Sequence, residues 1–465
     1  MLYEPIRCIN YTKIWLSMRR ILESGITYAF MFMLMGGFTA LLLGSELRER
    51  TVVEGYPAAS IALTSLEGLI YAGCGFLVLL HWKSTLRGAA AAWPYLLVAL
   101  FAIVSTFWSV DPAKTFLRGG VVMGTTIFGV YLGSRYTTQE IQTILMRSFL
   151  GLVGLSLVVL IVAPSLVLDS SHTGTFRGLT EHKNLLGEFM GQFLLLACTY
   201  HFRSRFRFAK IATILLALVM LASARSGSAL ISTAAGLAVL PVLLLMRFRK
   251  NQVMPLAAIG LVLFCGLMWF AWTEFDSLLN LLGKDRTLTG RAEIWGMVEE
   301  MIARRPWLGY GYDAFWQGLH GPSFAIVAQE GWEVPHSHNG YLEALLGLGV
   351  VGMGIIGFAL LRTVKDALLC VRENFRIEGL WPFVYLTFYL VHSSAEASLF
   401  RRDGYTYLLT VVLATSLALN RSRLTVGRRQ NSSPGITPIL ALHIADRCDT
   451  KNCGGNLGFS STPEA

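Results

Sequence analysis

The residues best suited to chemistry lie in the segment Pro335-His336-Ser337-His338-Asn339-Gly340-Tyr341, directly before a long apolar run. Ser337 and Asn339 are good helix caps, so we expect His338 at the amino end of the following helix. A helix start disfavours imidazolium and keeps the ring neutral, the form that accepts a proton. The same end attracts phosphate. By position alone, a general base and a histidine that only caps the helix are equally plausible.

A metal bound by His336 and His338 lacks an evident third ligand, so no metal site is expected.

Three arginines, Arg177, Arg225 and Arg291, lie outside the segments in which the positive-inside rule places most basic residues. Arg225 interrupts an apolar stretch, where an arginine costs roughly 2.5–3.5 kcal/mol on insertion scales, so it should face an interior or an aqueous cavity. Guanidiniums that converge on one cavity suit a pyrophosphate, which they can bind in a bidentate manner. The alternative is that each arginine pairs with a carboxylate near the end of an apolar run, such as Glu188, Glu343 or Glu396.

The composition shows which elements must position these side chains. Of the 465 residues, 54% are hydrophobic and 15% are charged, where a soluble domain carries about 25%. This excludes a soluble enzyme, a disordered scaffold and a small secreted disulfide module, and it predicts an all-α polytopic membrane protein. About twelve transmembrane helices are expected, at 27–44, 58–81, 89–108, 117–134, 148–168, 184–201, 211–224, 226–246, 254–273, 341–361, 379–396 and 404–420.

The distribution of basic residues orients the chain. The net charge of +10 is not a nucleic-acid signal here, because more than half of the 39 lysines and arginines fall in loops assigned to the cytoplasm. Both termini are therefore predicted to be cytoplasmic. Four regions follow: nine spans in 1–273, a large outer loop in 274–340, three spans in 341–430 and a polar, unstructured tail in 431–465. Within the outer loop, Arg291 to Ala303 reads as a short amphipathic helix.

Several stretches together resemble one family. His338-Asn339 followed by Gly349 and Gly352 is similar to the signature of bacterial O-antigen ligases and Wzy-type polymerases. Within that family the chain looks most like exopolysaccharide polymerases of the succinoglycan type, and the resemblance covers most of 90–400. Other similar stretches are Trp108-Ser109-Val110-Asp111-Pro112, Gly178-Leu179-Thr180-Glu181-His182-Lys183-Asn184, Thr289-Gly290-Arg291 and Arg305-Pro306-Trp307-Leu308-Gly309-Tyr310-Gly311.

The resemblance implies a GT-C-like helical fold in the bacterial inner membrane and an undecaprenyl-pyrophosphate-linked oligosaccharide as donor. It implies glycosyl transfer at the periplasmic face without a cofactor or an obligatory metal. Carried onto this sequence, the family's pyrophosphate-binding arginines are Arg177, Arg225 and Arg291, and its loop histidine is His338. His182, Lys183, Asn339 and His336 are possible supporting residues.

The chemistry of the step agrees with this assignment. Pyrophosphate is a good leaving group, so the reaction needs charge neutralisation and a base for the attacking hydroxyl. Direct displacement predicts inversion of the anomeric centre and no covalent glycosyl-enzyme. Three hypotheses remain: a polymerase of lipid-linked repeat units, a ligase that moves a finished glycan onto another acceptor, and a flippase or transporter without chemistry. A separate flippase and a chain-length regulator are conceivable partners of the polymerase.

Overall fold

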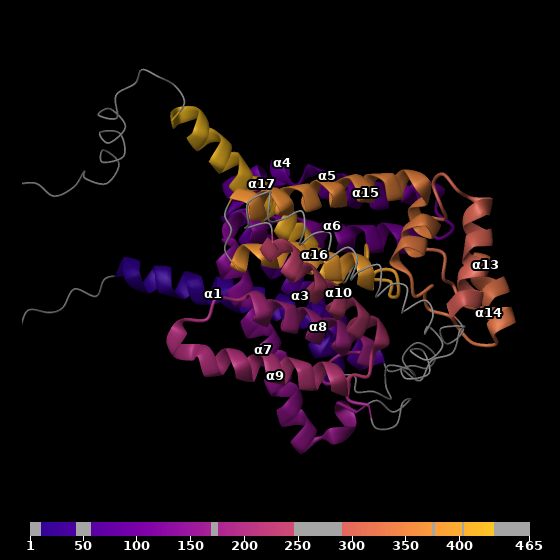
Figure 1. Cartoon of the computed structure of the whole chain (residues 1–465). Coiled ribbons are helices and arrows are strands. Elements are labelled where there is room, and N and C mark those ends of the chain that lie inside the picture. The colour runs from indigo at the N-terminus through magenta and orange to yellow at the C-terminus, as the bar shows by residue number, and fades with distance from the viewer. Residues whose placement is uncertain are drawn as a thin grey trace, which may run out of the picture. The chain divides into compact units, whose positions relative to one another are not determined.

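The computed structural model describes residues 11–42, 57–168, 175–245, 291–373, 377–401 and 404–431, and residues 1–419 belong to one compact unit. This part of the chain is helical and contains no strand beyond an isolated bridge between Leu168 and Phe176. The predicted all-α class is therefore confirmed for the described residues. The helices are α1 (Tyr11–Leu34), α3 (Pro57–Leu80), α4 (Trp82–Ala91), α5 (Trp93–Val104), α6 (Pro112–Arg135), α7 (Thr138–Val162), α8 (Lys183–Thr199), α9 (Arg207–Ser223), α10 (Gly227–Leu245), α13 (Arg291–Arg304), α14 (Phe324–Glu330), α15 (Gly340–Glu373), α16 (Ile377–His392) and α17 (Tyr405–Asn431), with short 3₁₀ turns at Ser105–Trp108, Pro164–Leu166, Ser204–Phe206 and Gly321–Ser323 (Figure 1).

Six stretches of helix among the described residues are long and apolar enough to cross a membrane. A seventh results if the bent pair Trp82–Ala91 and Trp93–Trp108 forms one span. The chain is thus a multi-pass helical membrane protein. The six stretches are Ile61–Leu80, Pro112–Arg135, Thr138–Val162, Ser204–Ser223, Gly227–Leu244 and Gly340–Arg372.

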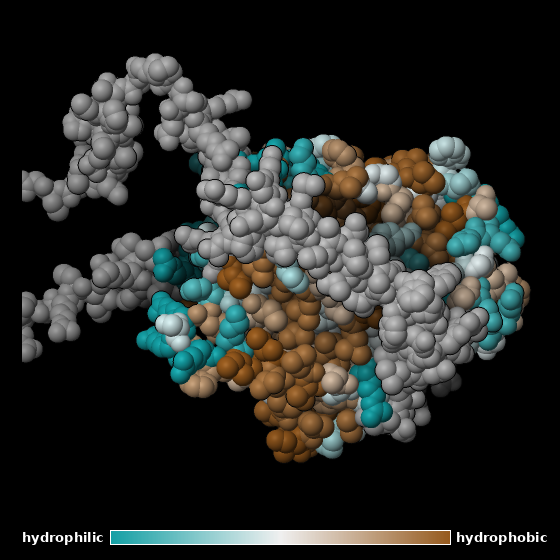
Figure 2. Space-filling model, in the orientation of Figure 1, coloured by the Kyte–Doolittle hydropathy of each residue, from teal (hydrophilic) through white to brown (hydrophobic). Residues whose placement is uncertain are grey.

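The outer surface of the bundle is hydrophobic where α7 and α9 face outward. Ile161, Val162, Phe208 and Val219 are each more than half exposed. Figure 2 shows this surface as a broad brown area over the two helices. Apolar side chains on that scale are stable against lipid tails and costly in water, so these helices form part of the lipid-facing surface.

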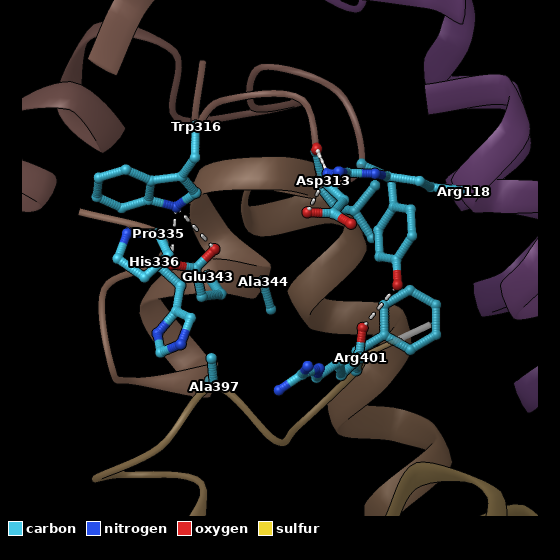
Figure 3. Close-up of a pocket in the computed structure, with 13 residues that line it drawn as sticks. Arg118, Asp313, Trp316, Pro335, His336, Glu343, Ala344, Ala397 and Arg401 are labelled. Atoms are coloured by element: carbon cyan, nitrogen blue, oxygen red, sulfur yellow. Dashed lines mark hydrogen bonds and ion pairs between the residues drawn. The ribbon is translucent and has the colours of Figure 1, made fainter. Parts of the chain in front are cut away.

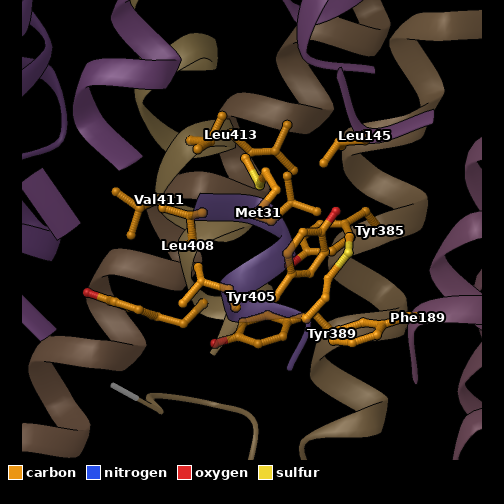
Figure 4. Close-up of a cluster of buried hydrophobic side chains, with 14 of the residues drawn as sticks. Met31, Leu145, Phe189, Tyr385, Tyr389, Tyr405, Leu408, Val411 and Leu413 are labelled. Carbon is orange, nitrogen blue, oxygen red and sulfur yellow. The ribbon is translucent and has the colours of Figure 1, made fainter. Parts of the chain in front are cut away.

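A ring-rich core sits between α1, α7, α8, α16 and α17 (Figure 4). Tyr385 and Tyr389 of α16 stack almost parallel, and Tyr405 packs edge-on against Phe189 of α8. The hydroxyl groups of the two α16 tyrosines donate hydrogen bonds to backbone carbonyls: Tyr385 to Thr406 at 2.6 Å, and Tyr389 to Leu399. The first bond attaches the start of α17 to α16, and the second attaches the middle of the segment 393–404, which connects the two helices.

Helix α15 is broken at Gly349, whose φ of 65° and ψ of −169° are not helical. The segment 306–311 fills this break: Val350 N–H donates to the Pro306 carbonyl at 2.8 Å, and Tyr310 N–H donates to the Leu346 carbonyl at 2.9 Å. The indole of Trp108 donates to the Leu308 carbonyl at 2.8 Å. Three of the sequence stretches that carry the family resemblance therefore meet in one backbone junction, which fixes the start of α15.

The helices differ from the predicted spans in three places. The expected span 89–108 is bent by 88° between α4 and α5, because Pro94 provides no N–H for a continuous helix. Helix α1, at the place of the span expected over 27–44, begins earlier, at Tyr11, and α15 continues to Glu373, beyond the end of the span expected over 341–361. The break at Arg225 between the spans predicted over 211–224 and 226–246 is present as the turn between α9 and α10, and the amphipathic helix predicted over 291–303 is α13.

Helix α13 buries Ile294, Val298 and Met301 on one face, as expected for an amphipathic helix. It lies beside α14 at one end of the bundle (Figure 1). The predicted span 254–273, the beginning of the large loop and residues 432–465 of the tail lie outside the described residues, so these predictions are not tested.

Replacing Gly349 with alanine should destabilise the protein. A Cβ atom there would lie 2.3 Å from the backbone carbonyl carbon of Trp307, and the positive φ would add roughly 1–3 kcal/mol of strain. Thermal unfolding in detergent should show a clearly lower midpoint for Gly349→Ala. Gly354→Ala, in the same helix with nothing within 4 Å of the added atom, is the matched control. Equal midpoints for the two variants would contradict this account of the junction.

Candidate active site

A single carboxylate, Glu396, contacts side chains at the amino ends of four helices. Its Oε1 accepts from Arg291 Nη2 at 3.0 Å, from Asn184 Nδ2 at 3.0 Å and from Ser228 Oγ at 3.3 Å. Its Oε2 lies 3.4 Å from His338 Nδ1. These four partners lie at the amino ends of α13, α8, α10 and α15 respectively, so four helix starts meet at one residue of the loop 393–404.

Glu396 is 9% exposed. Burial alone would raise the pKa of this carboxyl group, but the hydrogen bond with His338 and the charge of Arg291 hold its pKa well below the usual range. Glu396 is therefore ionised at neutral pH. The partial positive charges of the four helix starts add to this preference for an anion.

The backbone around His338 is held in place from both sides. Asn339 Oδ1 accepts from the N–H groups of Tyr341 at 3.0 Å and Leu342 at 3.3 Å, so α15 begins at Gly340 as its cap residues predict. Gly340 N–H in turn donates to the carbonyls of Ser393 and Glu396. His338 has a φ of 54°, which is uncommon for a residue with a Cβ atom. Strain of this kind occurs often at functional sites.

His336 supports the same loop. Its Nδ1 accepts the N–H of His338 at 3.2 Å, and the two rings lie 4.2 Å apart in a T-shaped arrangement. Burial, together with the nearby His338 and Arg401, lowers the pKa of His336 to about 3, although Glu396 opposes this shift. The ring of His336 is therefore neutral at pH 7, which is the form that can accept this bond.

The structure brings together only some of the predicted arginines. Arg291 lies in the Glu396 cluster and also donates to the Ala395 carbonyl. Arg225 is exposed, with a φ of 47°, three residues before Ser228, so it lies at the same end of α10 as the cluster. Its guanidinium makes no hydrogen bond or ion pair with another residue of the described part of the chain.

Arg177 is placed differently. It is 5% exposed, and its guanidinium donates to the backbone carbonyls of Leu166, Leu168, Thr180 and Glu181. Through these hydrogen bonds Arg177 stabilises the loop before α8. A role in pyrophosphate binding is not tested by these contacts and stays a prediction.

The possible supporting residues before α8 cap that helix. His182 is exposed, and its Nδ1 accepts the Asn184 N–H at 3.2 Å. Lys183 is the first residue of α8. Asn184, which the sequence did not single out, is the residue of this stretch that reaches Glu396.

Sequence reasoning also missed the importance of Glu396, which it considered only as a possible partner of an arginine. A carboxylate within a predicted apolar span is a usable signal, since ionisable residues in such spans face the interior and are often functional. Asn184 and Ser228 carry no comparable signal, because polar residues at helix starts are common caps.

Residues 212–357 match the family model Wzy_C, described as O-antigen ligase. The resemblance to the O-antigen ligase and Wzy-type family is confirmed. The chain is also 25% identical over 373 residues to the exopolysaccharide production protein ExoQ of Rhizobium meliloti (strain 1021), covering 72% of this chain and 83% of that protein. The family match includes Arg225, Arg291 and His338, whereas Arg177 and Glu396 lie outside it.

The neutral state of His336 predicts a pH dependence. Its pKa falls from 6.5 to about 3 on folding, so between these values the unfolded chain binds a proton that the folded chain does not. The stability from this residue is complete above pH 6.5 and decreases as the pH falls toward 3. Thermal unfolding midpoints between pH 7 and pH 4.5 should therefore fall less steeply for His336→Gln than for the unmodified protein. His320→Gln, at an exposed histidine of the same loop, should retain the full slope; equal slopes for all three proteins would contradict the assignment.

Proposed function

We propose that the protein polymerises undecaprenyl-pyrophosphate-linked oligosaccharide repeat units into exopolysaccharide at the periplasmic face of the bacterial inner membrane. The observation that carries the proposal is the contact between His338 and Glu396 beside Arg291, at the point where four helices begin. The family match and the similarity to an exopolysaccharide production protein support the substrate class.

The proposed topology has twelve spans in a GT-C-like arrangement, with both termini in the cytoplasm and 274–340 outside. The basic segments 203–207 and 247–250 support the orientation, since they follow α8 and α10 at the ends opposite the cluster. The starts of α8, α10 and α15 then lie on the periplasmic side. The site is thereby open to lipid-linked units that have already crossed the membrane, which requires a separate flippase.

His338 is the proposed general base. If its Nδ1–H donates to Glu396, its Nε2 carries the free electron pair that accepts a proton from the attacking sugar hydroxyl. Glu396 has two functions in this arrangement: it fixes the tautomer and orientation of the ring, and it stabilises the imidazolium that forms. A base positioned in this way contributes roughly 10²–10⁴-fold to the rate.

The transfer itself is a direct displacement. The acceptor oxygen forms a bond to the anomeric carbon of the donor while the bond from that carbon to the pyrophosphate oxygen breaks. The electron pair leaves with the pyrophosphate, and the hydroxyl proton moves to His338. This step inverts the anomeric configuration and requires no covalent glycosyl-enzyme.

The leaving pyrophosphate needs cationic partners. Arg225 is exposed at the start of α10, and Arg291 uses only two of its five N–H donors in its contacts with Glu396 and Ala395. The adjacent helix starts supply further backbone N–H groups. Fixed donors at a surface of low dielectric stabilise the charge that develops as the bond breaks.

A ligase that transfers a finished glycan to another acceptor is the second candidate, because the family description names O-antigen ligase and the donor chemistry is the same. A flippase without chemistry is disfavoured, since it would have no use for a carboxylate-bound histidine beside an arginine. The lipid-linked material that accumulates in a deletion strain separates the three. Single repeats on the periplasmic side indicate a polymerase, whereas lipid-linked polymer indicates a ligase and single repeats trapped inside indicate a flippase.

Replacing His338 with alanine should reduce polymer formation by roughly 10²–10⁴-fold, because the proposed general base is removed. Polymer yield and chain length can be measured in a deletion strain that expresses the variant at the normal level. His320→Ala, at an exposed histidine of the same loop, should retain normal yield. Normal polymer from His338→Ala would refute the assignment of the base.

A further inference from the structure

Two cavities of the described chain share one charged residue, Arg401. The small cavity, of about 250 Å³, lies beside the start of α15 and is shown in Figure 3. The large cavity, of about 590 Å³, lies between α1, α3, α6, α8 and the start of α17. Arg401 belongs to the segment 393–404 that also carries Glu396, and it is among the residues that line both cavities. The sequence analysis did not single it out.

The small cavity has the lining expected for a sugar ring. Tyr312 and Trp316 offer aromatic surface, and Arg118 and Asp313 form an ion pair of 2.9 Å in which each side chain is 28% exposed. Rings of this kind present an apolar face, while the charged pair offers both donors and acceptors to hydroxyl groups. His336 forms part of the wall, and its ring lies 4.2 Å from that of His338. A sugar in this cavity is therefore next to the proposed base.

The large cavity is lined by side chains of several helices. Met33, Leu63, Leu117 and Phe189 give it an apolar wall that suits the hydrocarbon of a lipid. Its lining also includes the carboxylates of Glu67 on α3 and Glu188 on α8. Where the cavity meets the segment 393–404 and the loop before α8, the Arg401 guanidinium lies 3.8 Å from a carboxylate oxygen of Glu181.

Arg401 can exchange this partner for a stronger one. Its side chain is 41% exposed, and an ion pair at 3.8 Å in such a position contributes little to stability. A phosphate group accepts two parallel N–H bonds from a guanidinium and carries more charge than a carboxylate. Figure 3 shows the side chain of Arg401 extending toward Ala397 along the edge of the small cavity, on the same side as His336.

We propose that Arg401 binds the diphosphate of the lipid-linked substrate, with the adjoining sugar in the small cavity and the first prenyl units in the large cavity. The inference rests on the proposed function, since it assumes a polyprenyl-diphosphate-linked sugar. The order of chemical groups in that molecule, from hydrocarbon through diphosphate to sugar, matches the order of a cavity with apolar side chains from four helices, a guanidinium and a cavity with aromatic and charged side chains.

The first test measures binding of undecaprenyl diphosphate to the full-length protein in lipid nanodiscs. Arg401→Gln should weaken binding about tenfold or more, as expected for loss of a charge-assisted hydrogen bond. Glu181→Gln should bind at least as tightly as the unmodified protein, because it removes the competitor of the diphosphate. Arg304→Gln, at an exposed arginine at the end of α13, is the matched control and should not change binding.

Arg401→Gln is expected to weaken binding of undecaprenyl diphosphate, whereas Glu181→Gln is not. This difference distinguishes a residue that binds the diphosphate from one that only forms a structural ion pair. If Glu181→Gln weakened binding as much as Arg401→Gln, the pair would be structural and the proposal would be wrong. If Arg401→Gln bound normally, the proposal would also be wrong, while the proposed function would stand. Failure of the unmodified protein to bind undecaprenyl diphosphate would instead refute the proposed function.

Filling each cavity tests the placement of the substrate without altering a charge. Ala397→Leu should weaken binding of the sugar-bearing lipid several-fold and leave sugar-free undecaprenyl diphosphate unaffected. Gly68→Leu, in the wall of the large cavity where an added Cβ meets nothing within 4 Å, should weaken binding of both lipids. Gly75→Leu, two turns further along α3 and also open, is its control. Loss of sugar-free lipid binding in Ala397→Leu, or unchanged binding in Gly68→Leu, would overturn the placement.

Discussion

The arrangement of the site depends on one buried carboxylate. Glu396 binds Arg291, Asn184, Ser228 and His338, which come from four different helix starts. Positive helix ends and an arginine at close range repel one another, so they can converge only if an anion lies between them. Glu396 supplies that anion permanently. In the proposed function, these helices hold a cationic surface for a diphosphate before the substrate binds, and His338 is oriented by the same carboxylate.

The scaffold around this carboxylate is built from ordinary membrane-protein interactions. Tyrosines of α16 donate through their hydroxyl groups to the segment 393–404 and to the start of α17, and the break of α15 at Gly349 is filled by backbone hydrogen bonds with 306–311. Both devices fix irregular backbone near the end of a helical bundle, where main-chain groups must find partners within the protein. The loop that carries His338 has a positive φ at that residue and is held by hydrogen bonds at Asn339 and Gly340.

The sequence was sufficient for the helical class, the turn at Arg225, the helix α13 and the position of His338 at the start of α15, because apolar periodicity and cap residues are local signals. The motifs around His338 were also sufficient to indicate the family. The sequence could not predict that Asn184 and Glu396, 212 residues apart, are hydrogen-bonded, since contact between distant residues depends on how the helices pack. The sequence also could not predict the bend between α4 and α5, or the hydrogen bonds of Arg177 with backbone carbonyls. Both depend on how the helices pack.

The central claim is that Glu396 acts on the reaction through His338, and a double-mutant cycle tests it most directly. The rate of a single glycosyl transfer should be measured with purified protein and lipid-linked repeats for His338→Ala, Glu396→Gln and the double variant, at saturating substrate. Residues that act as a unit are strongly non-additive. The account predicts that the loss of rate in the double variant is clearly smaller than the product of the two single losses, because part of the effect of Glu396 passes through His338. Multiplication of the two single effects would show that Glu396 acts independently of His338 and would contradict it.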